Sequence, residues 1–267
     1  MTKVAPKERV LVTGASTGIG EALARRFARA RHDLVLVARS EDKLKALAKE
    51  LVDKHKVVVV VVAADLAKPG AIPKLAATLR RRKLDIGILV NNAGINHVGQ
   101  FEKLAPATHQ DLIALNIAAA TNMLAHFLPD MVVRGSGHVL NIASTSSFMP
   151  VPFMATYAAS KAYLLSLTES LSEECKSSGV SFTALCPGVT ATPMMESMSQ
   201  RNAKFVKFVG TTVLDVNEVA DAGYDACMKG QVIRIPGKFN LTQAIASRAM
   251  PKWLTRRVLG YLGRLSH

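Results

Sequence analysis

The sequence predicts an α/β fold, in which a doubly wound parallel sheet of about seven strands carries helices on both faces. Short apolar runs alternate with longer segments of helical periodicity from one end of the chain to the other. The apolar runs are continuous, which is typical of strands that are buried on both faces. Strands that alternate with helices of this length form βαβ units, whose right-handed crossovers place helices on both sides of the sheet.

The expected elements follow one another in a regular order. Strand 9–13 precedes helix 18–30, strand 34–38 precedes the charged amphipathic helix 41–53, and the β-branched strand 56–62 precedes helix 72–81. Strand 86–91 leads to the long helix 108–133, strand 138–143 to helix 156–177, and strand 180–186 to helix 216–229, before a short strand at 231–235. No linker, repeat or low-complexity segment interrupts this order, so we expect one domain over residues 1–267.

The composition excludes several classes of protein. The chain is 49% hydrophobic, which excludes a mainly disordered protein. Its 34 Lys and Arg against 20 Asp and Glu give a net charge of +14. The basic residues are scattered with little aromatic interleaving, so we expect no nucleic-acid partner and interpret the charge as a contribution to solubility.

The sequence also favours a cytoplasmic location. The longest apolar run, residues 57–64, spans eight residues, whereas a membrane-spanning helix needs about 20. No charged segment, apolar segment and cleavage site open the chain in the manner of a signal peptide. Cys175, Cys186 and Cys227 are an odd number without metal-like spacing, so we expect neither a disulfide framework nor a metal site.

A glycine-rich turn follows the first strand, with the sequence Thr13-Gly14-Ala15-Ser16-Thr17-Gly18-Ile19-Gly20. A helix begins within it, and the free N–H groups and positive dipole of a helix N-terminus favour phosphate. The spacing is G-x-x-x-G-x-G and not the common dinucleotide fingerprint G-x-G-x-x-G. Such a turn can also be a plain tight connection, but its place at the first strand–helix junction favours a nucleotide.

Further motifs follow in order along the chain. Residues 91–94 read Asn-Asn-Ala-Gly after the fourth strand, and Tyr157 and Lys161 form Y-x-x-x-K with Ser144 thirteen residues earlier. Cys186-Pro187-Gly188 precedes Thr190 and Thr192, and Asn116 lies in the long helix. With these motifs, residues 8–235 resemble the short-chain dehydrogenase/reductase family, which implies a Rossmann-type sheet and hydride transfer with a nicotinamide cofactor.

The resemblance implies that Asn116, Ser144, Tyr157 and Lys161 are catalytic. Tyr157 and Lys161 lie four residues apart on one helix, so they share a face, and a nearby ammonium lowers the pKa of a phenol. Tyr157 then exchanges a proton with the substrate oxygen, to which Ser144 donates a hydrogen bond. In the family Lys161 also binds the nicotinamide ribose and Asn116 anchors a water relay. Taken singly, the Tyr–Lys pair could lie on a helix surface, Ser144 in an ordinary loop, and Asn116 at a helix bend.

The end of the second strand predicts NADP(H) rather than NAD(H). It reads Ala38-Arg39-Ser40, so no carboxylate repels a 2′-phosphate and a guanidinium is present to bind it. Arg39 could alternatively be solvated, Ser40 could cap the next helix, and Asp65, expected at the adenine edge, could be a turn residue. The full expected cofactor set is Gly14, Ser16, Thr17, Gly18, Ile19, Gly20, Arg39, Ser40, Asp65, Leu66, Asn91, Ala93, Gly94, Tyr157, Lys161, Pro187, Gly188, Val189 and Thr192.

Two apolar segments flank the catalytic residues. We expect residues 148–154 and the methionines Met194, Met195 and Met198 to form the wall of a substrate pocket, with His97 at its entrance. A lid is expected near residues 190–212, where Arg201, Lys204 and Lys207 form a basic face. That face is either solvated or a docking surface for an acidic carrier or an acyl thioester.

The basic tail, residues 241–267, matches the family least. From Pro251 onward, apolar residues fall roughly on one side of a helix and no acid opposes the positive charges. We expect it to pack within an oligomer in preference to lying on an anionic membrane, although it could also cover the active site. The resemblance implies a homodimer or homotetramer.

The sequence therefore predicts an NADP(H)-dependent oxidoreductase that interconverts a ketone or aldehyde and an alcohol on a hydrophobic substrate. One alternative is a reductase of 3-oxoacyl thioesters on a carrier or CoA. Another, of a different class, is a protein that binds NADP(H) as a sensor or scaffold without catalysis.

Overall fold

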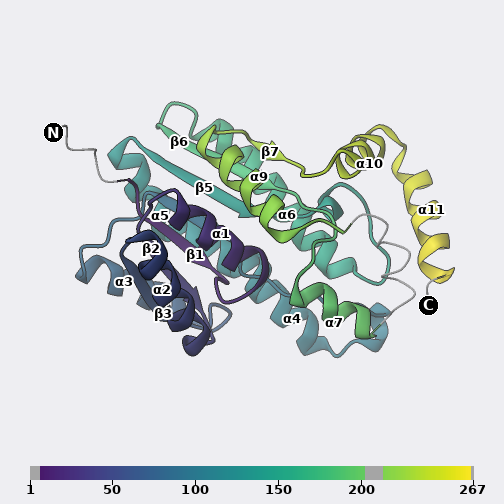
Figure 1. The fold of residues 1–267 in the computed structure, drawn as a ribbon. Helices are drawn as coiled ribbons and strands as arrows, with labels where there is room; N and C mark the ends of the chain where they lie inside the picture. The colour runs from purple at the N-terminus through teal and green to yellow at the C-terminus, as the bar shows by residue number, and fades with distance from the viewer. Residues whose placement is uncertain (1–6, 202–212, 266–267) are drawn as a thin grey trace.

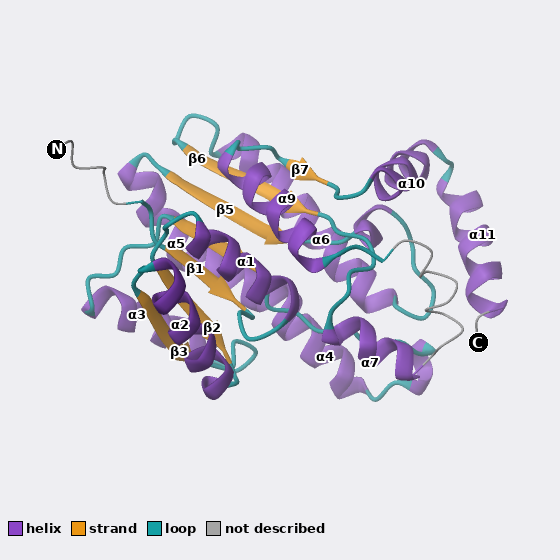
Figure 2. Cartoon of the chain, viewed as in Figure 1, coloured by secondary structure: helices purple, strands orange, loops and turns teal. Residues whose placement is uncertain are grey.

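The computed structural model describes residues 7–201 and 213–265, and its centre is the parallel seven-stranded sheet that the sequence predicts. The strands lie in the order β3-β2-β1-β4-β5-β6-β7, every neighbouring pair is parallel, and Figure 2 shows them in orange. Their bounds are β1 Val10–Thr13, β2 Leu34–Ala38, β3 Val59–Ala63, β4 Ile88–Asn91, β5 Gly137–Ile142, β6 Val180–Leu185 and β7 Ile233–Arg234. The predicted fold class is confirmed.

Helices cover both faces of this sheet (Figure 1). Their bounds are α1 Gly18–Arg29, α2 Glu41–His55, α3 Ala71–Arg81, α4 Pro106–Ile113, α5 Ala120–Arg134, α6 Ala155–Glu174, α7 Pro193–Arg201, α9 Val216–Met228, α10 Lys238–Ala249 and α11 Lys252–Leu265. Short 3₁₀ turns occupy Phe101–Lys103 and Thr145–Phe148. The six expected helices are present, whereas the sequence analysis did not identify α10.

The core has two layers. On one side of the sheet Phe27 of α1 and Val219 of α9 are fully buried against strand residues such as Leu36. On the other side Leu75 of α3 and Phe127 of α5 pack with partly buried leucines of α6. Buried strands with apolar residues on both faces produce the continuous runs that the sequence shows.

Two boundaries differ from those expected. The third strand begins at Val59 rather than at residue 56, because Lys56 closes α2 in a left-handed conformation with φ of 53°. The long helix expected at 108–133 is continuous from Pro106 to Arg134, but Ala114–Ala119 is a π-helical turn between α4 and α5. This 29-residue stretch is long and apolar enough to cross a bilayer, yet residues along it belong to the domain core.

A buried chain of polar side chains joins the middle of the sheet to α6. Asn91 Nδ2 on β4 donates to Asn141 Oδ1 on β5 at 3.0 Å, and Asn141 Nδ2 donates to Thr168 Oγ1 on α6 at 2.9 Å. The Thr168 hydroxyl in turn donates to the Leu164 carbonyl at 2.6 Å. Asn141 and Thr168 are completely buried, so their polar groups depend on these partners.

We predict that Asn141→Ala lowers the free energy of unfolding by about 3 kcal/mol, because it leaves buried polar groups of Asn91 and Thr168 without their partner. Urea denaturation followed by circular dichroism measures the loss. The control is Asn122→Ala on the exposed side of α5, where Asn122 Nδ2 bonds only the Ala118 carbonyl, and we expect a change within about 0.5 kcal/mol. Equal losses in the two variants would contradict a structural role for the buried chain.

Candidate active site

The carboxyl ends of the strands open into one cavity of about 460 Å³. In Figure 2 the strand arrows point toward the end of the molecule that carries α7, α10 and α11. Most of the expected site residues line this cavity: Gly14, Ser16, Thr17, Gly18, Ile19, Arg39, Ser40, Asp65, Leu66, Ala93, Gly94, Ser144, Tyr157, Lys161, Pro187, Gly188, Val189 and Thr192. Gly20, Asn91 and Asn116 do not line the cavity; they pack against, or form hydrogen bonds with, the segments that do.

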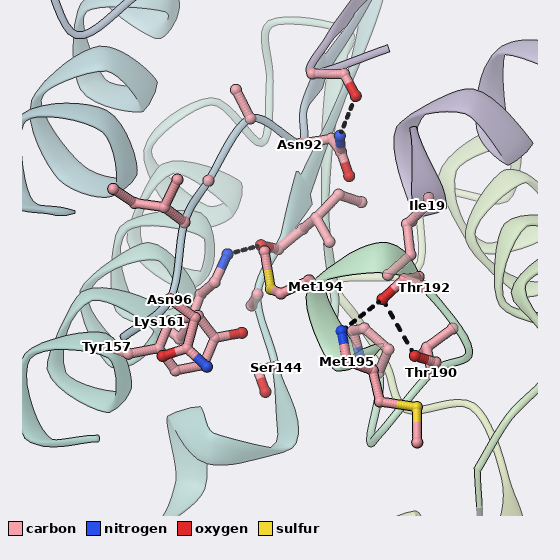
Figure 3. Close-up of a pocket in the computed structure, with 18 of the residues that line it drawn as sticks. Ile19, Asn92, Asn96, Ser144, Tyr157, Lys161, Thr190, Thr192, Met194 and Met195 are labelled. Carbon is pink, nitrogen blue, oxygen red and sulfur yellow. Dashed lines mark hydrogen bonds between the residues drawn. The ribbon is translucent and has the colours of Figure 1, made fainter. Parts of the chain in front are cut away.

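The glycine-rich turn is packed too closely for side chains. Gly14 has φ of 65°, and a Cβ there would lie 2.8 Å from Asn92 Nδ2. A Cβ on Gly20 would lie 2.3 Å from the Gly14 carbonyl oxygen. Asn92 fastens the turn by donating from Nδ2 to the carbonyls of Thr13 and Gly14, at 2.9 and 3.2 Å (Figure 3). The sequence analysis gave Asn92 no role of its own, although the Asn-Asn pair was the available signal.

The start of α1 fits a pyrophosphate. Thr17 is the N-cap residue, its backbone is extended, and its side chain makes no capping hydrogen bond. The first N–H groups of α1 therefore have no side-chain acceptor, and Thr17, Gly18 and Ile19 line the cavity. Such a helix end binds phosphate, so the glycine cradle and α1 together suit a dinucleotide.

The end of β2 presents a cation and a hydroxyl to the same cavity. Arg39 and Ser40 are exposed and line it. Ser40 occupies the N-cap position of α2, but its hydroxyl makes no capping bond. Within the described residues Arg39 forms no ion pair, whereas the nearby Glu41 is paired with Lys45 at 2.8 Å. Both side chains are therefore available to a phosphate.

Ser144, Tyr157 and Lys161 line the cavity, and Figure 3 shows Tyr157 and Lys161 beside one another. Ser144 follows β5, and its Oγ accepts a hydrogen bond from the Ser146 N–H at 3.1 Å, which leaves its proton to donate. Tyr157 and Lys161 lie one turn apart on α6, with Lys161 Nζ 5.7 Å from the centre of the Tyr157 ring. Lys161 Nζ donates to the Ile142 carbonyl at 2.7 Å.

The expected electrostatic effect of Lys161 on Tyr157 is wrong for the chain without cofactor. Burial raises the pKa of Tyr157, and the hydrogen bond with Ser144 opposes that effect only in part. Burial also lowers the pKa of Lys161 to about 8. The amine is itself desolvated, with only 6% of Lys161 exposed, and it points to the Ile142 carbonyl. In this state burial, and not the neighbouring amine, decides the direction in which the pKa of Tyr157 is shifted.

Asn116 acts behind the cavity. It lies in the π-helical turn, where its Oδ1 accepts from the Ile95 N–H at 2.9 Å. Its Nδ2 donates to the Ile95 carbonyl at 3.0 Å and to Ser160 Oγ at 3.1 Å. A Cβ on Gly94 would lie 3.2 Å from Asn116 Oδ1 and 3.7 Å from Lys161 Nζ, so the three residues are neighbours. The side chain thus holds the backbone beside Gly94, and its place in a water relay stays a prediction.

The substrate part of the cavity is mostly apolar. The expected lining is confirmed for Met149, Val151, Pro152, Met154, Met194 and Met195. It is wrong for Pro150, which does not line this cavity, and for Phe148, whose ring centre lies 4.8 Å from the Arg248 guanidinium. It is also wrong for Phe153 and His97, which line a separate cavity of about 30 Å³ on another side of Tyr157.

The tail contributes two residues that the sequence analysis missed. Gln243 of α10 and Leu259 of α11 line the main cavity. The amphipathic pattern after Pro251 was a signal for α11 but did not single out Leu259. The expected lid residues Lys204 and Lys207 lie outside the described residues, as do the side chains of Met198 and Arg201. Among residues 7–201 and 213–265, no group of three His, Cys, Asp or Glu side chains is placed to hold a metal ion.

Comparison with known proteins gives the family. Residues 8–203 match the sequence profile of the family described as short chain dehydrogenase. The chain belongs to the short-chain dehydrogenase/reductase family. Members of this family are oxidoreductases of alcohol and carbonyl groups that use NAD(H) or NADP(H), and the chain is assigned to that class of enzyme.

Three proteins illustrate the similarity. A short-chain dehydrogenase from Sphingobium yanoikuyae, solved with NADPH, is 36% identical with a TM-score of 0.78, over 87% of this chain and 89% of that one. The bulky-bulky ketone specific alcohol dehydrogenase from Comamonas testosteroni is 31% identical with a TM-score of 0.77, over 92% and 93%. The human inactive hydroxysteroid dehydrogenase-like protein 1 is 37% identical over 69% of this chain and 56% of its own length.

The buried amine of this short-chain dehydrogenase/reductase makes its stability depend on pH. Below pH 8 a charged Lys161 is buried at a cost. Between pH 8 and the ordinary value of 10.5 the unfolded chain keeps a proton that the folded chain has released, so stability rises with pH by up to about 3 kcal/mol. We predict that Lys161→Met removes this rise.

Chemical denaturation of both proteins at neutral pH and near pH 10.5 measures the effect. The variant should be the more stable protein at neutral pH, and its advantage should shrink at the higher pH. Lys68→Met, which removes an exposed amine, controls for the change in net charge. An advantage that stays constant across the two pH values would refute the burial cost.

Proposed function

We propose that the chain is an NADP(H)-dependent reductase that interconverts a hydrophobic ketone or aldehyde and its alcohol. The observation that carries the proposal is the arrangement inside one cavity. The glycine turn, the start of α1, Arg39, four methionines and the group of Ser144, Tyr157 and Lys161 all line the same cavity. A binding protein without catalysis has no use for a buried amine beside a phenol.

The residues of the chain supply proton transfer and placement. When bound, the cofactor supplies the hydride. Tyr157 donates its phenolic proton to the substrate oxygen, and its raised pKa keeps that proton in place at neutral pH. Ser144 donates a hydrogen bond to the same oxygen, because its own acceptor position is filled by the Ser146 N–H. Lys161 stands next to Tyr157 with a pKa of about 8, close enough to neutrality to return a proton.

The preference for NADP(H) rests on the end of β2. Arg39 and Ser40 line the cavity where the adenosine ribose is bound in this fold, and the strand ends in Ala38 without a carboxylate. A guanidinium forms charge-assisted hydrogen bonds with phosphate. The relative from Sphingobium yanoikuyae, solved with NADPH, supports the same choice.

The substrate class rests on the pocket wall. Met149, Met154, Met194 and Met195 give an apolar, adaptable surface, which suits a bulky lipophilic carbonyl compound. The relative named for bulky-bulky ketones supports this class. Reduction of 3-oxoacyl thioesters stays the alternative. The basic residues expected to dock such a substrate, Arg201, Lys204 and Lys207, have side chains that lie outside the described part of the chain.

One human relative is named inactive, so a sensor or scaffold without turnover is the competing hypothesis of another class. A panel of ketones, diketones, quinones and oxoacyl thioesters, followed by NADPH absorbance, separates the three. Turnover of thioesters alone favours the oxoacyl reductase, and NADPH binding without turnover of any compound favours the sensor. A homodimer or homotetramer, a cytoplasmic location and the absence of a nucleic-acid partner stay predictions.

We predict that Tyr157→Phe lowers the rate of ketone reduction by about 10²- to 10⁴-fold, because the substrate oxygen loses its proton donor. Steady-state kinetics at saturating NADPH measure the loss. NADPH affinity, measured by fluorescence titration, should change little, since the aromatic ring remains in place and only its hydroxyl is lost. Retained turnover in this variant would sink the proposed mechanism.

We predict that Arg39→Ala weakens NADPH binding by about ten-fold or more and NADH binding by much less, because only NADPH carries the 2′-phosphate that the guanidinium binds. Calorimetric titration with each cofactor gives the two ratios. Lys43→Ala is the matched control, since Lys43 is an exposed cation on α2 that does not line the cavity. Equal losses of NADPH and NADH would overturn the cofactor assignment.

A further inference from the structure

The last two helices expose large apolar side chains to solvent. On α10 Phe239 and Ile245 are 55% and 59% exposed, and on α11 Trp253 and Tyr261 are 56% and 60% exposed. Leu241 and Val258 are exposed as well. Figure 1 shows the two helices together at one end of the molecule, away from the sheet. We call the exposed residues of α10 and α11 the tail surface.

Only the inner sides of these helices are used by the domain. Asn240 and Ala244 of α10 and Thr255 of α11 are buried. Asn240 Nδ2 donates to the Pro236 carbonyl at 2.9 Å, and Gln243 and Leu259 line the catalytic cavity. More than half of the surface of Phe239, Ile245, Trp253 and Tyr261 is therefore left uncovered by the described part of the chain. An apolar surface of this kind marks an interaction site.

The charge around the tail surface has one sign. From residue 226 to residue 267 the chain contains eight Lys and Arg and no Asp or Glu. Arg248 is engaged with Glu169 at 3.4 Å and with the Phe148 ring. Lys238, Lys252, Arg256 and Arg257 are exposed and form no ion pair with any residue in the described ranges. The tail surface thus combines apolar groups with cations that no acidic side chain neutralises.

The combination of apolar groups and unneutralised cations favours one of two binding partners for the tail surface, a second copy of the chain or a lipid membrane. In a symmetric dimer the same patch lies on both subunits, so a second copy would bring these cations against one another. An anionic lipid surface offers the opposite charge and an apolar layer beneath it. Trp and Tyr favour that boundary, and basic residues add attraction to acidic headgroups. We propose that α10 and α11 dock the protein on membranes that contain anionic phospholipid, with Trp253 and Tyr261 inserted at the headgroup level.

This proposal departs from the expectation that the tail packs within an oligomer. That expectation rested on the amphipathic pattern after Pro251, which is the same for a subunit interface and for a membrane surface. The cations of the tail surface, which form no ion pair with any residue in the described ranges, distinguish the two. Docking on a membrane does not depend on the proposed catalytic function, and its test needs no substrate.

The test uses the full chain and vesicles of phosphatidylcholine with or without phosphatidylglycerol. We expect the protein to float with the vesicles only when phosphatidylglycerol is present, and to be released by high salt. Arg256→Glu with Arg257→Glu should weaken this binding by about ten-fold or more. The matched control is Arg81→Glu with Arg82→Glu, which makes the same charge change at the exposed end of α3 and should leave most of the binding.

Trp253 provides a second readout in the unmodified protein, because it is the chain's only tryptophan. Its emission should shift to shorter wavelength on anionic vesicles and be quenched by brominated lipid. Equal losses in the two double variants would show attraction by net charge alone and overturn the proposal. The proposal would also be overturned if the unmodified protein did not bind anionic vesicles, or if it bound them without quenching of Trp253 by brominated lipid. It would be overturned as well if the unmodified protein did not bind vesicles and Arg256→Glu with Arg257→Glu lowered its oligomer mass.

Discussion

The position of α6 relative to the sheet is the constraint on which the active site depends. Ser144 comes from the end of β5, whereas Tyr157 and Lys161 come from α6, so the two elements must keep a fixed relation. The buried bond between Asn141 and Thr168 supplies it, and Asn91 extends it to β4. A hydrogen bond between fully buried groups has no solvent to replace it, so it specifies one arrangement of strand and helix.

The chain without cofactor holds its catalytic groups in an electrostatically unfavourable state. Burial disfavours the charged form of both groups, so the pKa of the Tyr157 phenol is raised above its ordinary value and that of the Lys161 amine is lowered below its own. Lys161 Nζ donates its hydrogen bond to the Ile142 carbonyl. At neutral pH the site therefore holds a neutral phenol beside an amine whose charge is disfavoured by burial.

The sequence could predict the parts that repeat a physical rule. Buried strands, helix periodicity, the glycine turn and the Tyr–Lys spacing are local patterns, and helices on both faces of the sheet follow from right-handed crossovers. The roles of Asn92 and Gln243 could not be predicted, because each depends on a contact with a distant segment. The π-helical turn at Asn116 has no signature in apolar periodicity. Phe148 and Phe153 were expected in the pocket because hydrophobicity indicates burial but not the direction in which a side chain points.

Helix α11 has an inner side that lines the cavity and an outer side that is exposed to solvent. Leu259 on the inner side of α11 is part of the cavity wall, while Trp253 and Tyr261 on the same helix face outward. A rigid helix transmits any displacement of one side to the other. Any effect that a compound bound against Leu259 has on a contact with the outer side is therefore reciprocal: the contact changes the affinity of the compound by the same factor.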